Sequence, residues 1–237
     1  MAFLLTACGH KPAGANIPAP PPVLAPAPTP APVPDKTVPA EEAGKEVPDI
    51  PAQAKPLAVE TGVASWYGAP YNNRRGSNGE TYDMHALTAA HLTLPLGSIV
   101  RVTNIKTGHS AVVRITDRGP FVEGRIIDLS MAAAKQVDVW QPGTATVRLE
   151  VLESPVPLDQ GGRWAVQIGG FDEQHAATDL ADHLSRRYRT AKVISFRSPV
   201  GAWWVRVRVQ DDDRQRAHEL AKETETAEGA IFLVRLD

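Results

Sequence analysis

The sequence predicts two small folded domains, a closed β-barrel followed by an α+β sandwich, behind an extended N-terminal segment. Fourteen of the 21 prolines lie between Pro12 and Pro56, and a segment this rich in proline cannot form a packed core. After it, short apolar runs separated by Gly and Pro are typical of a small barrel. Residues 162–237 then show the order strand, helix, strand, strand, helix, strand, which is typical of a ferredoxin-like sandwich.

The composition limits the class of partner. With 25 basic and 27 acidic residues the net charge is −2, and neither expected domain has the basic character of a nucleic-acid binder. We therefore expect no nucleic-acid partner and favour an uncharged or mildly charged polymer. No run of 18 apolar residues predicts a membrane-spanning helix, and the single cysteine, Cys8, excludes an intrachain disulfide.

Residues 1–57 are expected to anchor the folded part and to hold it away from a membrane. Leu5-Thr6-Ala7-Cys8-Gly9 resembles a bacterial lipobox. The resemblance implies that residues 1–7 are the remnant of a signal, that Cys8 is lipidated, and that the anchor lies in the outer membrane. Residues 8–57 are rich in Pro and Ala, which favours an extended tether on the order of 100 Å long. The alternatives are an incidental cysteine and a linker with no length requirement.

Residues 58–153 are expected to form the barrel, because short β-rich runs recur there at close spacing. A Gly-containing loop at 106–109 predicts a hairpin, and Ser130 is placed to cap a short helix at 131–136. The expected strands are 59–67, 98–105, 110–116, 125–129 and 146–152.

Residues 162–237 are expected to form the sandwich, after a linker at 154–161. Apolar residues spaced by four in 173–188 predict a helix, and a second is expected at 213–223. The expected strands are 163–168, 191–196, 203–209 and 231–236.

The strand at 203–209 predicts which face of this sheet binds a ligand. Its valines alternate with Trp204 and Arg206, so the valines should meet the helices. The open face would then carry Trp204, Arg206 and, from the neighbouring strand, Gln167. An aromatic ring flanked by polar donors suits a sugar chain; the alternative is a solvated face with one isolated tryptophan.

Several side chains of the barrel could carry out acid–base chemistry, although each has a purely structural alternative. Asp117 ends an apolar strand before a Gly-Pro turn, so it could face a cleft; equally, it could cap that turn or pair with Arg114 or Arg118. Glu80 follows Asn-Gly in a Gly-rich loop, where a solvated turn residue is common. His91 lies in an apolar segment, where a histidine is more often a hydrogen-bonded core residue than a catalyst.

The barrel motifs, taken in order, resemble the rare lipoprotein A family. They are Ser65-Trp66-Tyr67-Gly68, Asn78-Gly79-Glu80, Leu87-Thr88-Ala89-Ala90-His91, Asp117-Arg118-Gly119-Pro120-Phe121 and Ile127-Asp128-Leu129-Ser130. The resemblance implies a six-stranded double-psi β-barrel and a lytic transglycosylase that prefers peptidoglycan strands stripped of stem peptides.

The same resemblance implies roles for individual residues. Asp117 would be the catalytic acid/base, Glu80 a second carboxylate, and His91 a hydrogen-bond partner of an acid. Trp66, Tyr67, Asn78 and Arg118 would bind substrate, although Trp66 and Tyr67 could equally be core residues. Asp128 precedes the short helix and is interpreted as structural. No cofactor or metal is expected, because His85 and His91 have no further His or Cys nearby.

The second domain resembles the SPOR (sporulation-related repeat) family at Trp164-Ala165-Val166-Gln167-Ile168-Gly169-Gly170-Phe171 and the Ala-rich helix that follows. The resemblance implies binding to denuded peptidoglycan, which is enriched at division sites. Gln210-Asp211-Asp212 replaces the Gly-Pro-Phe that the family usually has after its third strand.

Taken together, the sequence predicts a lytic transglycosylase anchored to the outer membrane, facing the periplasm and acting at the septum, where septal-ring proteins are further candidate partners. Cleavage of a β-1,4 glycosidic bond needs a proton on the leaving oxygen. If the muramic acid's C6 hydroxyl attacks C1, one carboxyl can act first as acid and then as base. The alternatives are a non-catalytic wall-binding protein and a hydrolase that releases a reducing end.

Overall fold

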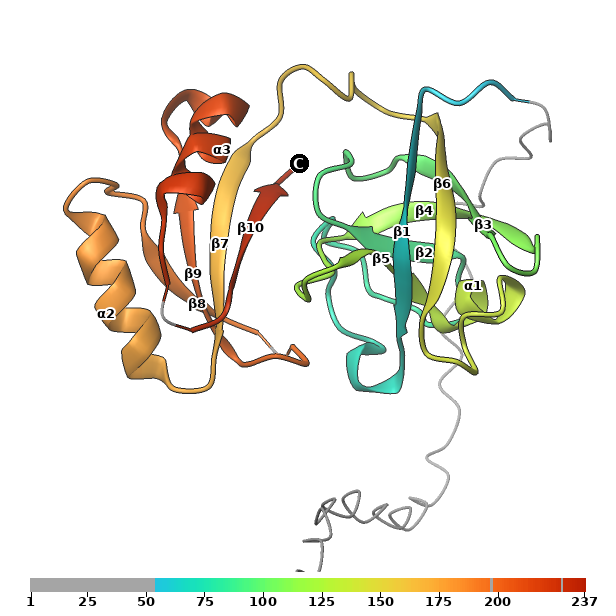
Figure 1. The fold of residues 1–237 in the computed structure, drawn as a ribbon, viewed down its shortest axis with the longest axis horizontal. Helices are drawn as coiled ribbons and strands as arrows, with labels where there is room; N and C mark the ends of the chain where they lie inside the picture. The colour runs from blue at the N-terminus through green and yellow to red at the C-terminus, as the bar shows by residue number, and fades with distance from the viewer. Residues whose placement is uncertain (1–53, 197, 227) are drawn as a thin grey trace, which may run out of the picture. The chain divides into compact units, whose positions relative to one another are not determined.

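The structure is a computed structural model that describes residues 54–196, 198–226 and 228–237. The expected lipidation site at Cys8 and the expected tether up to residue 53 lie outside these residues. Six strands with one short α-helix come first along the chain, and four strands with two α-helices follow (Figure 1). Within the described ranges, no helix is long and apolar enough to cross a membrane.

The first six strands close into a barrel in the order β1-β5-β2-β4-β3-β6, which confirms the predicted barrel. The β1–β5 and β2–β4 pairs are parallel, and the other four pairs are antiparallel. The strands are β1 (Ala58–Tyr67), β2 (Thr88–His91), β3 (Ile99–Asn104), β4 (Ser110–Asp117), β5 (Arg125–Ser130) and β6 (Ala145–Glu153).

The local sequence pattern did not predict β2. This strand has only four residues, Thr-Ala-Ala-His, and alanine is a poor strand former. Its strand conformation comes from its neighbours, because β4 and β5 supply hydrogen-bond partners on its two sides. Closure of the barrel therefore fixes a segment that would not form a strand by itself.

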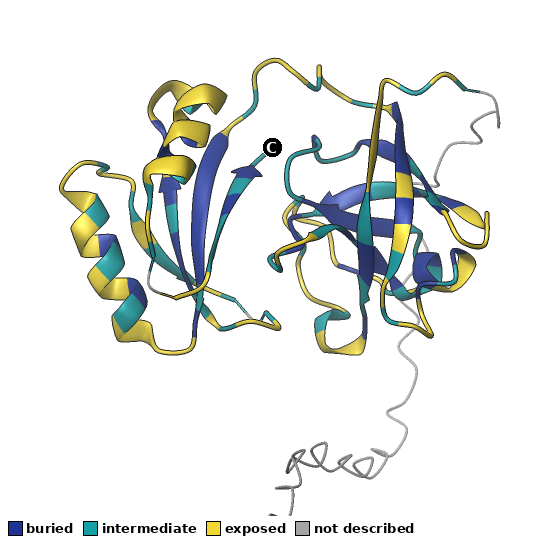
Figure 2. Ribbon diagram, in the orientation of Figure 1, coloured by how far each residue is buried: buried dark blue, intermediate teal, exposed yellow. Residues whose placement is uncertain are grey.

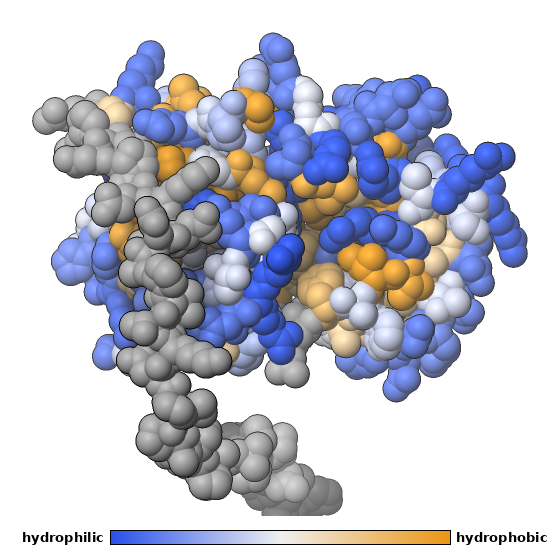
Figure 3. Space-filling view, turned by 180° about the vertical axis from the view of Figure 1, so that it is seen from behind, coloured by the Kyte–Doolittle hydropathy of each residue, from blue (hydrophilic) through white to orange (hydrophobic). Residues whose placement is uncertain are grey.

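The barrel interior is filled by alternate residues of its strands. Ile115, Ile127 and Leu129 are fully buried and belong to one apolar cluster. Ala89 also belongs to this cluster and is fully buried, whereas Ala90 points to the opposite side of β2. Figure 2 shows these buried stretches as dark segments within the barrel strands, and Figure 3 shows hydrophilic side chains interrupted by separate hydrophobic patches on the rear surface.

The short helix α1 (Met131–Gln136) begins where the sequence predicted. The Ser130 hydroxyl accepts a hydrogen bond from the Ala133 backbone N–H at 3.2 Å and donates one to the Ala86 carbonyl at 2.7 Å. Ser130 thus caps the helix and also ties it to the loop before β2.

The second group of elements is a four-stranded sheet in the order β10-β7-β9-β8, with α2 and α3 on one face (Figure 1). All three strand pairs are antiparallel, and the apolar cluster joins Val205 and Val207 to Ala177 and Ala217 of the helices. The predicted α+β sandwich is therefore confirmed. Its elements are β7 (Trp164–Phe171), α2 (Gln174–Ser185), β8 (Lys192–Ser195), β9 (Trp203–Arg208), α3 (Arg214–Glu223) and β10 (Ala230–Arg235).

The face of this sheet opposite the helices carries the residues that the alternation predicted. Trp204 and Arg206 lie on that side, and Trp204 and Gln167 are both fully buried. Binding of a ligand to this face stays a prediction. The Trp204 ring stacks on Phe196 with centroids 5.1 Å apart and lies 6.2 Å from Phe232. The Gln167 side-chain oxygen accepts two hydrogen bonds from the Arg206 guanidinium, at 3.1 and 2.7 Å.

Replacing Trp204 with alanine tests this packing. Removing a fully buried tryptophan should cost about 3–5 kcal/mol of unfolding free energy, because the surrounding aromatic rings would border a cavity. Trp140→Ala is a matched control, since Trp140 is 39% exposed, and it should cost less than half as much. Urea unfolding followed by circular dichroism measures both variants. Equal losses would contradict the buried position of Trp204.

Candidate active site

Two aspartates flank one small residue across three neighbouring strands of the barrel. Ala90 of β2 pairs with Asp117 of β4 on one side and with Asp128 of β5 on the other. Two strand spacings therefore separate the aspartates, about 9.6 Å between their Cα atoms. Ala90 has only a methyl side chain, so the space between the two carboxyl groups stays open.

An irregularity in β4 sets the position of Asp117. Ala89 pairs with Ile115, but the next residue of β2 pairs with Asp117, so Thr116 is one extra residue in β4. Such a bulge redirects the side chains that follow it. Ile115 accordingly lies in the barrel core, while Asp117 is half-buried and lines a surface pocket.

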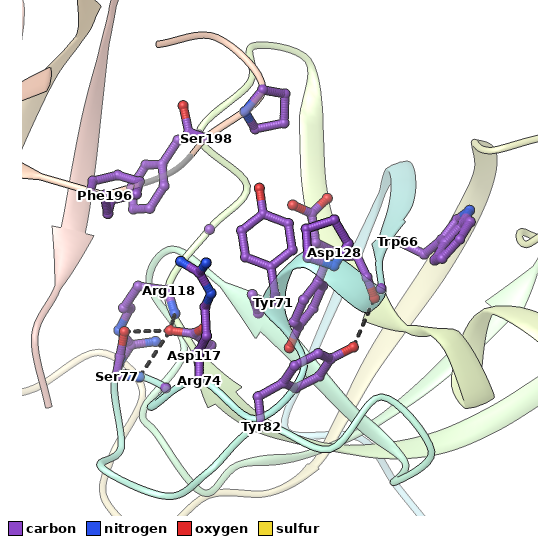
Figure 4. Close-up of a pocket in the computed structure, with 18 of the residues that line it drawn as sticks. Trp66, Tyr71, Arg74, Ser77, Tyr82, Asp117, Arg118, Asp128, Phe196 and Ser198 are labelled. Carbon is purple, nitrogen blue, oxygen red and sulfur yellow. Dashed lines mark hydrogen bonds between the residues drawn. The ribbon is translucent and has the colours of Figure 1, made fainter. Parts of the chain in front are cut away.

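The pocket is bounded by these strands and by the loop between β1 and β2 (Figure 4). Phe196 and Ser198, also labelled in Figure 4, belong to the second domain. The barrel residues with polar or aromatic side chains that line the pocket are Ser65, Trp66, Tyr67, Tyr71, Arg74, Arg75, Ser77, Tyr82, Asp117, Arg118, Phe121, Arg125 and Asp128.

Asp117 is held through one of its two carboxylate oxygens. Oδ1 accepts hydrogen bonds from the Ser77 backbone N–H at 3.0 Å, the Ser77 hydroxyl at 2.5 Å and the Arg118 backbone N–H at 2.8 Å. Oδ2 has no hydrogen-bond partner within the part of the chain that the structure describes. The side chain is therefore fixed, while one oxygen remains available to a ligand.

Asp128 lies in a different environment. The Ser65 hydroxyl donates a hydrogen bond to its Oδ1, and Arg125 in turn donates to the Ser65 hydroxyl at 2.7 Å. Burial raises the pKa of Asp128 above its ordinary value, while Arg125 and Ser65 partly offset this because both favour the charged form. Asp128 thus holds a proton to higher pH than an exposed aspartate does.

Three tyrosines form the wall beside the aspartates. Tyr67 stacks on Tyr82 with centroids 4.4 Å apart and meets Tyr71 edge-on at 6.0 Å. Burial raises the pKa of Tyr67, and the negative charge of Asp117 raises it further, so its phenol stays neutral. Its hydroxyl is buried away from solvent. Tyr67 therefore contributes its ring to the pocket wall.

Glu80 and Asn78 do not line the pocket. Arg114 holds the Glu80 carboxylate through two hydrogen bonds, at 3.2 and 2.8 Å, and the Asn78 side chain accepts from the Glu80 backbone N–H at 3.0 Å. The loop thus uses both residues to fix its own shape. The second carboxylate of the pocket is Asp128, which the sequence interpretation had treated as structural.

His91 is also outside the pocket. It is 4% exposed, and its Nε2 lies 3.3 Å from the Glu60 carboxylate. Its Nδ1 accepts hydrogen bonds from the backbone N–H groups of Thr93 and Leu94, at 3.2 and 3.1 Å. His91 is thus a hydrogen-bonded core residue whose acidic partner is neither of the pocket aspartates.

Arg118 and Trp66 line the pocket but also have structural partners. The Arg118 guanidinium donates to the backbone carbonyls of His91 at 3.0 Å and Leu94 at 2.7 Å, and its burial lowers its pKa to about 10. Trp66 packs against the barrel core and lies 6.4 Å from Trp140. Trp66 and Tyr67 do not form a common platform, because successive residues of β1 point to opposite faces.

One local pattern in the sequence would have identified Asp128. In a strand with the pattern Ile-Ile-Asp-Leu-Ser, the residue between two buried positions faces away from the core. Ser65 carried no comparable local signal, because its connection to Asp128 depends on the parallel β1–β5 pairing. Arg125 lies three residues before Asp128 in β5, and its Nε is 3.8 Å from the Asp128 Oδ1.

Comparison with known proteins identifies two families. Residues 59–149 match the family described as lytic transglycolase, and residues 160–230 match the SPOR domain family. The chain is 42% identical over 158 residues to the endolytic peptidoglycan transglycosylase RlpA of Campylobacter jejuni, covering 56% of each chain. It is 57% identical over 99 residues to the protein of the same name from Vibrio cholerae, covering 42% of this chain and 38% of that one.

These matches cover only part of each relative. The chain spans about half the length, or less, of the curated relatives it matches. Among solved structures, the Streptomyces papain inhibitor matches with a TM-score of 0.35 and 20% identity, covering 41% of this chain and 97% of the inhibitor. That score is too low to support a conclusion.

The contacts of Asp128 predict a measurable pKa change. Ser65→Ala removes a hydrogen bond that favours the carboxylate, so the pKa of Asp128, already raised by burial, should rise further. Carbon-13 NMR titration of the labelled carboxyl group measures it. Ser110→Ala, at the exposed start of β4, is the control and should leave the value unchanged. An unshifted pKa in the Ser65→Ala variant would show that the hydrogen bond does not act on Asp128.

Proposed function

The chain belongs to the lytic transglycolase family over residues 59–149 and to the SPOR family over residues 160–230, and on that premise we propose that it is an endolytic peptidoglycan transglycosylase. Its substrate would be the β-1,4 bond between N-acetylmuramic acid and N-acetylglucosamine in strands that lack stem peptides. The observation that carries the proposal is the pair of aspartates on either side of Ala90.

The two aspartates have environments suited to different roles. The protonated form of Asp128 is favoured below its raised pKa and is lost as pH rises through that value. Asp128 is therefore suited to give its proton to the leaving glycosidic oxygen. Asp117, with one oxygen held by Ser77 and Arg118 and the other available, is placed to contact the substrate through its second oxygen.

The reaction balances without water. The proton of Asp128 passes to the N-acetylglucosamine oxygen as the bond to C1 of the muramic acid breaks, which leaves an oxocarbenium-like sugar. Asp117 stabilises this positive charge and takes the proton of the C6 hydroxyl as that oxygen bonds to C1. The product is a 1,6-anhydro end, and return of the proton from Asp117 to Asp128 restores the starting state. Sequence alone favoured Asp117 acting twice; the environment of Asp128 supports a shared role.

The second domain would hold the enzyme on the wall. Arg206, positioned by Gln167 on the sheet face opposite the helices, offers a cation to a glycan. Membership of the SPOR family supports binding to peptide-free glycan and enrichment at the septum. The lipobox-like sequence around Cys8 supports an outer-membrane anchor with the folded domains in the periplasm.

Digestion of amidase-treated sacculi tests the enzymatic proposal. The unmodified protein should release soluble fragments with 1,6-anhydro ends, identified by mass spectrometry. Asp117→Asn and Asp128→Asn should each lower the rate by at least about 100-fold, because a positioned acid or base contributes about 10²–10⁴-fold. Glu80→Gln is the matched control, since Glu80 lies outside the pocket, and it should stay within about tenfold of the unmodified protein.

The other results are equally informative. Fragments with reducing ends would identify a hydrolase. Binding to sacculi without any soluble product would identify a wall-binding protein. Loss of activity in Glu80→Gln, with activity retained in Asp128→Asn, would contradict the assignment of the two aspartates.

A further inference from the structure

Two arginines line the barrel side of the pocket without a partner for their charge. Arg74 and Arg75 are both exposed, and both border the pocket that contains the aspartates (Figure 4 labels Arg74). Within the described residues, neither guanidinium makes a hydrogen bond, an ion pair or a ring contact. A concave site with two unpaired cations is prepared for an anionic ligand.

The other two barrel arginines of the pocket are already engaged. Arg118 donates to the carbonyls of His91 and Leu94, and Arg125 donates to Ser65. Their partners hold these guanidinium groups in place. Recognition of an anion by the barrel therefore falls to Arg74 and Arg75.

The backbone that carries the two arginines is well fixed. The Tyr82 N–H donates to the Arg74 carbonyl at 2.8 Å, the Asn73 N–H donates to the Tyr82 carbonyl at 2.9 Å, and Arg75 forms an antiparallel bridge with Thr81. Tyr82 is 7% exposed and stacks on Tyr67. The arginines thus extend from a short ladder that is packed against the pocket wall, so binding of a ligand orders their side chains but not their backbone.

The charge of the pocket requires these cations if the substrate is an anion. Asp117 and Asp128 line the same pocket, and the negative charge of an ionised carboxylate such as Asp117 would repel an anionic glycan. A neutral polymer of N-acetylglucosamine would need no compensating charge. Two free guanidinium groups beside two carboxyl groups therefore favour a substrate that carries its own carboxylate.

Peptide-free peptidoglycan has such a carboxylate. The stem peptide is attached as an amide to the lactyl group on O3 of N-acetylmuramic acid, so its removal leaves a free lactyl carboxylate on each of these sugars. A guanidinium binds a carboxylate through two parallel N–H···O bonds. In a strand that keeps its peptides, an uncharged amide occupies this position and the peptide adds bulk.

We propose that Arg74 and Arg75 bind the free lactyl carboxylate of the N-acetylmuramic acid at the cleavage site and thereby select strands without stem peptides. This inference rests on the proposed transglycosylase function and assigns its substrate specificity to two residues. The arginines position the sugar; the aspartates carry out the chemistry.

The test compares two substrates that differ at the lactyl group. One is amidase-treated glycan with native lactyl carboxylates, and the other is the same glycan with those groups coupled to methylamine by a carbodiimide, which gives neutral methylamides. Release of 1,6-anhydro products gives kcat/KM for the full chain. The unmodified protein should prefer the native strands by about 10- to 100-fold, the range expected for charge-assisted hydrogen bonds.

The variant that removes both charges should lose only this preference. Arg74→Gln with Arg75→Gln should lower kcat/KM about 10- to 100-fold on native strands and change it less than about twofold on methylamide strands. Arg74→Lys with Arg75→Lys keeps the charge without the planar guanidinium. Its kcat/KM on native strands should lie between the values for the unmodified protein and the double glutamine variant. Arg148→Gln is the control, because Arg148 is an exposed barrel arginine paired with Glu150 and is not part of the pocket.

Two results would overturn the inference while leaving the transglycosylase proposal intact: equal cleavage of both strands by the unmodified protein, or an equal loss on both strands in the double variant. If neither strand is cleaved, the transglycosylase proposal fails, and dissociation constants for the two strands decide the role of the arginines. Tighter binding of native strands that disappears in the double variant supports the role; equal binding rejects it.

Discussion

The site depends on the register with which the barrel closes. Because β2 lies between β4 and β5, Ala90 is paired with Asp117 on one side and Asp128 on the other. The parallel β1–β5 pairing places Ser65 opposite Asp128. A shift of one residue in β5 would turn Asp128 toward the core and Leu129 toward the pocket. The apolar core therefore enforces the geometry of the site, since such a shift would also expose buried leucine and isoleucine side chains.

The electrostatics follow from that register. Asp128 lines the pocket at a buried position, where burial raises its pKa and favours its protonated form. Arg125 and Ser65 partly offset this effect, because both favour the carboxylate. Asp117 lies at the end of β4, where backbone and hydroxyl donors stabilise a carboxylate. The phenol of Tyr67, whose pKa is raised by burial and by the charge of Asp117, stays neutral in the pocket wall. Two chemically identical side chains thus have different surroundings.

Much of the fold could be predicted from sequence because its signals are local. The cap at Ser130 follows from a hydroxyl residue directly before an Ala-rich run. The alternation in β9 and the order of elements after residue 162 follow from periods of two and four residues. The choice of second carboxylate could not be predicted in this way. Glu80 lies in a plausible loop, but Arg114, 34 residues away, holds it outside the pocket. The contacts of Trp204 with Phe196 and Phe232 likewise depend on the sheet order, which local patterns do not contain.

The most direct test of this account is a crystal structure of the Asp117→Asn, Asp128→Asn variant with a peptide-free tetrasaccharide bound. The account predicts that the scissile glycosidic oxygen lies within hydrogen-bond reach of residue 128, about 2.6–3.2 Å. The muramic acid's C6 hydroxyl should lie on the side of residue 117, across Ala90. A tetrasaccharide bound to another face of the barrel, or one whose scissile oxygen is beyond the reach of both side chains, would contradict the account.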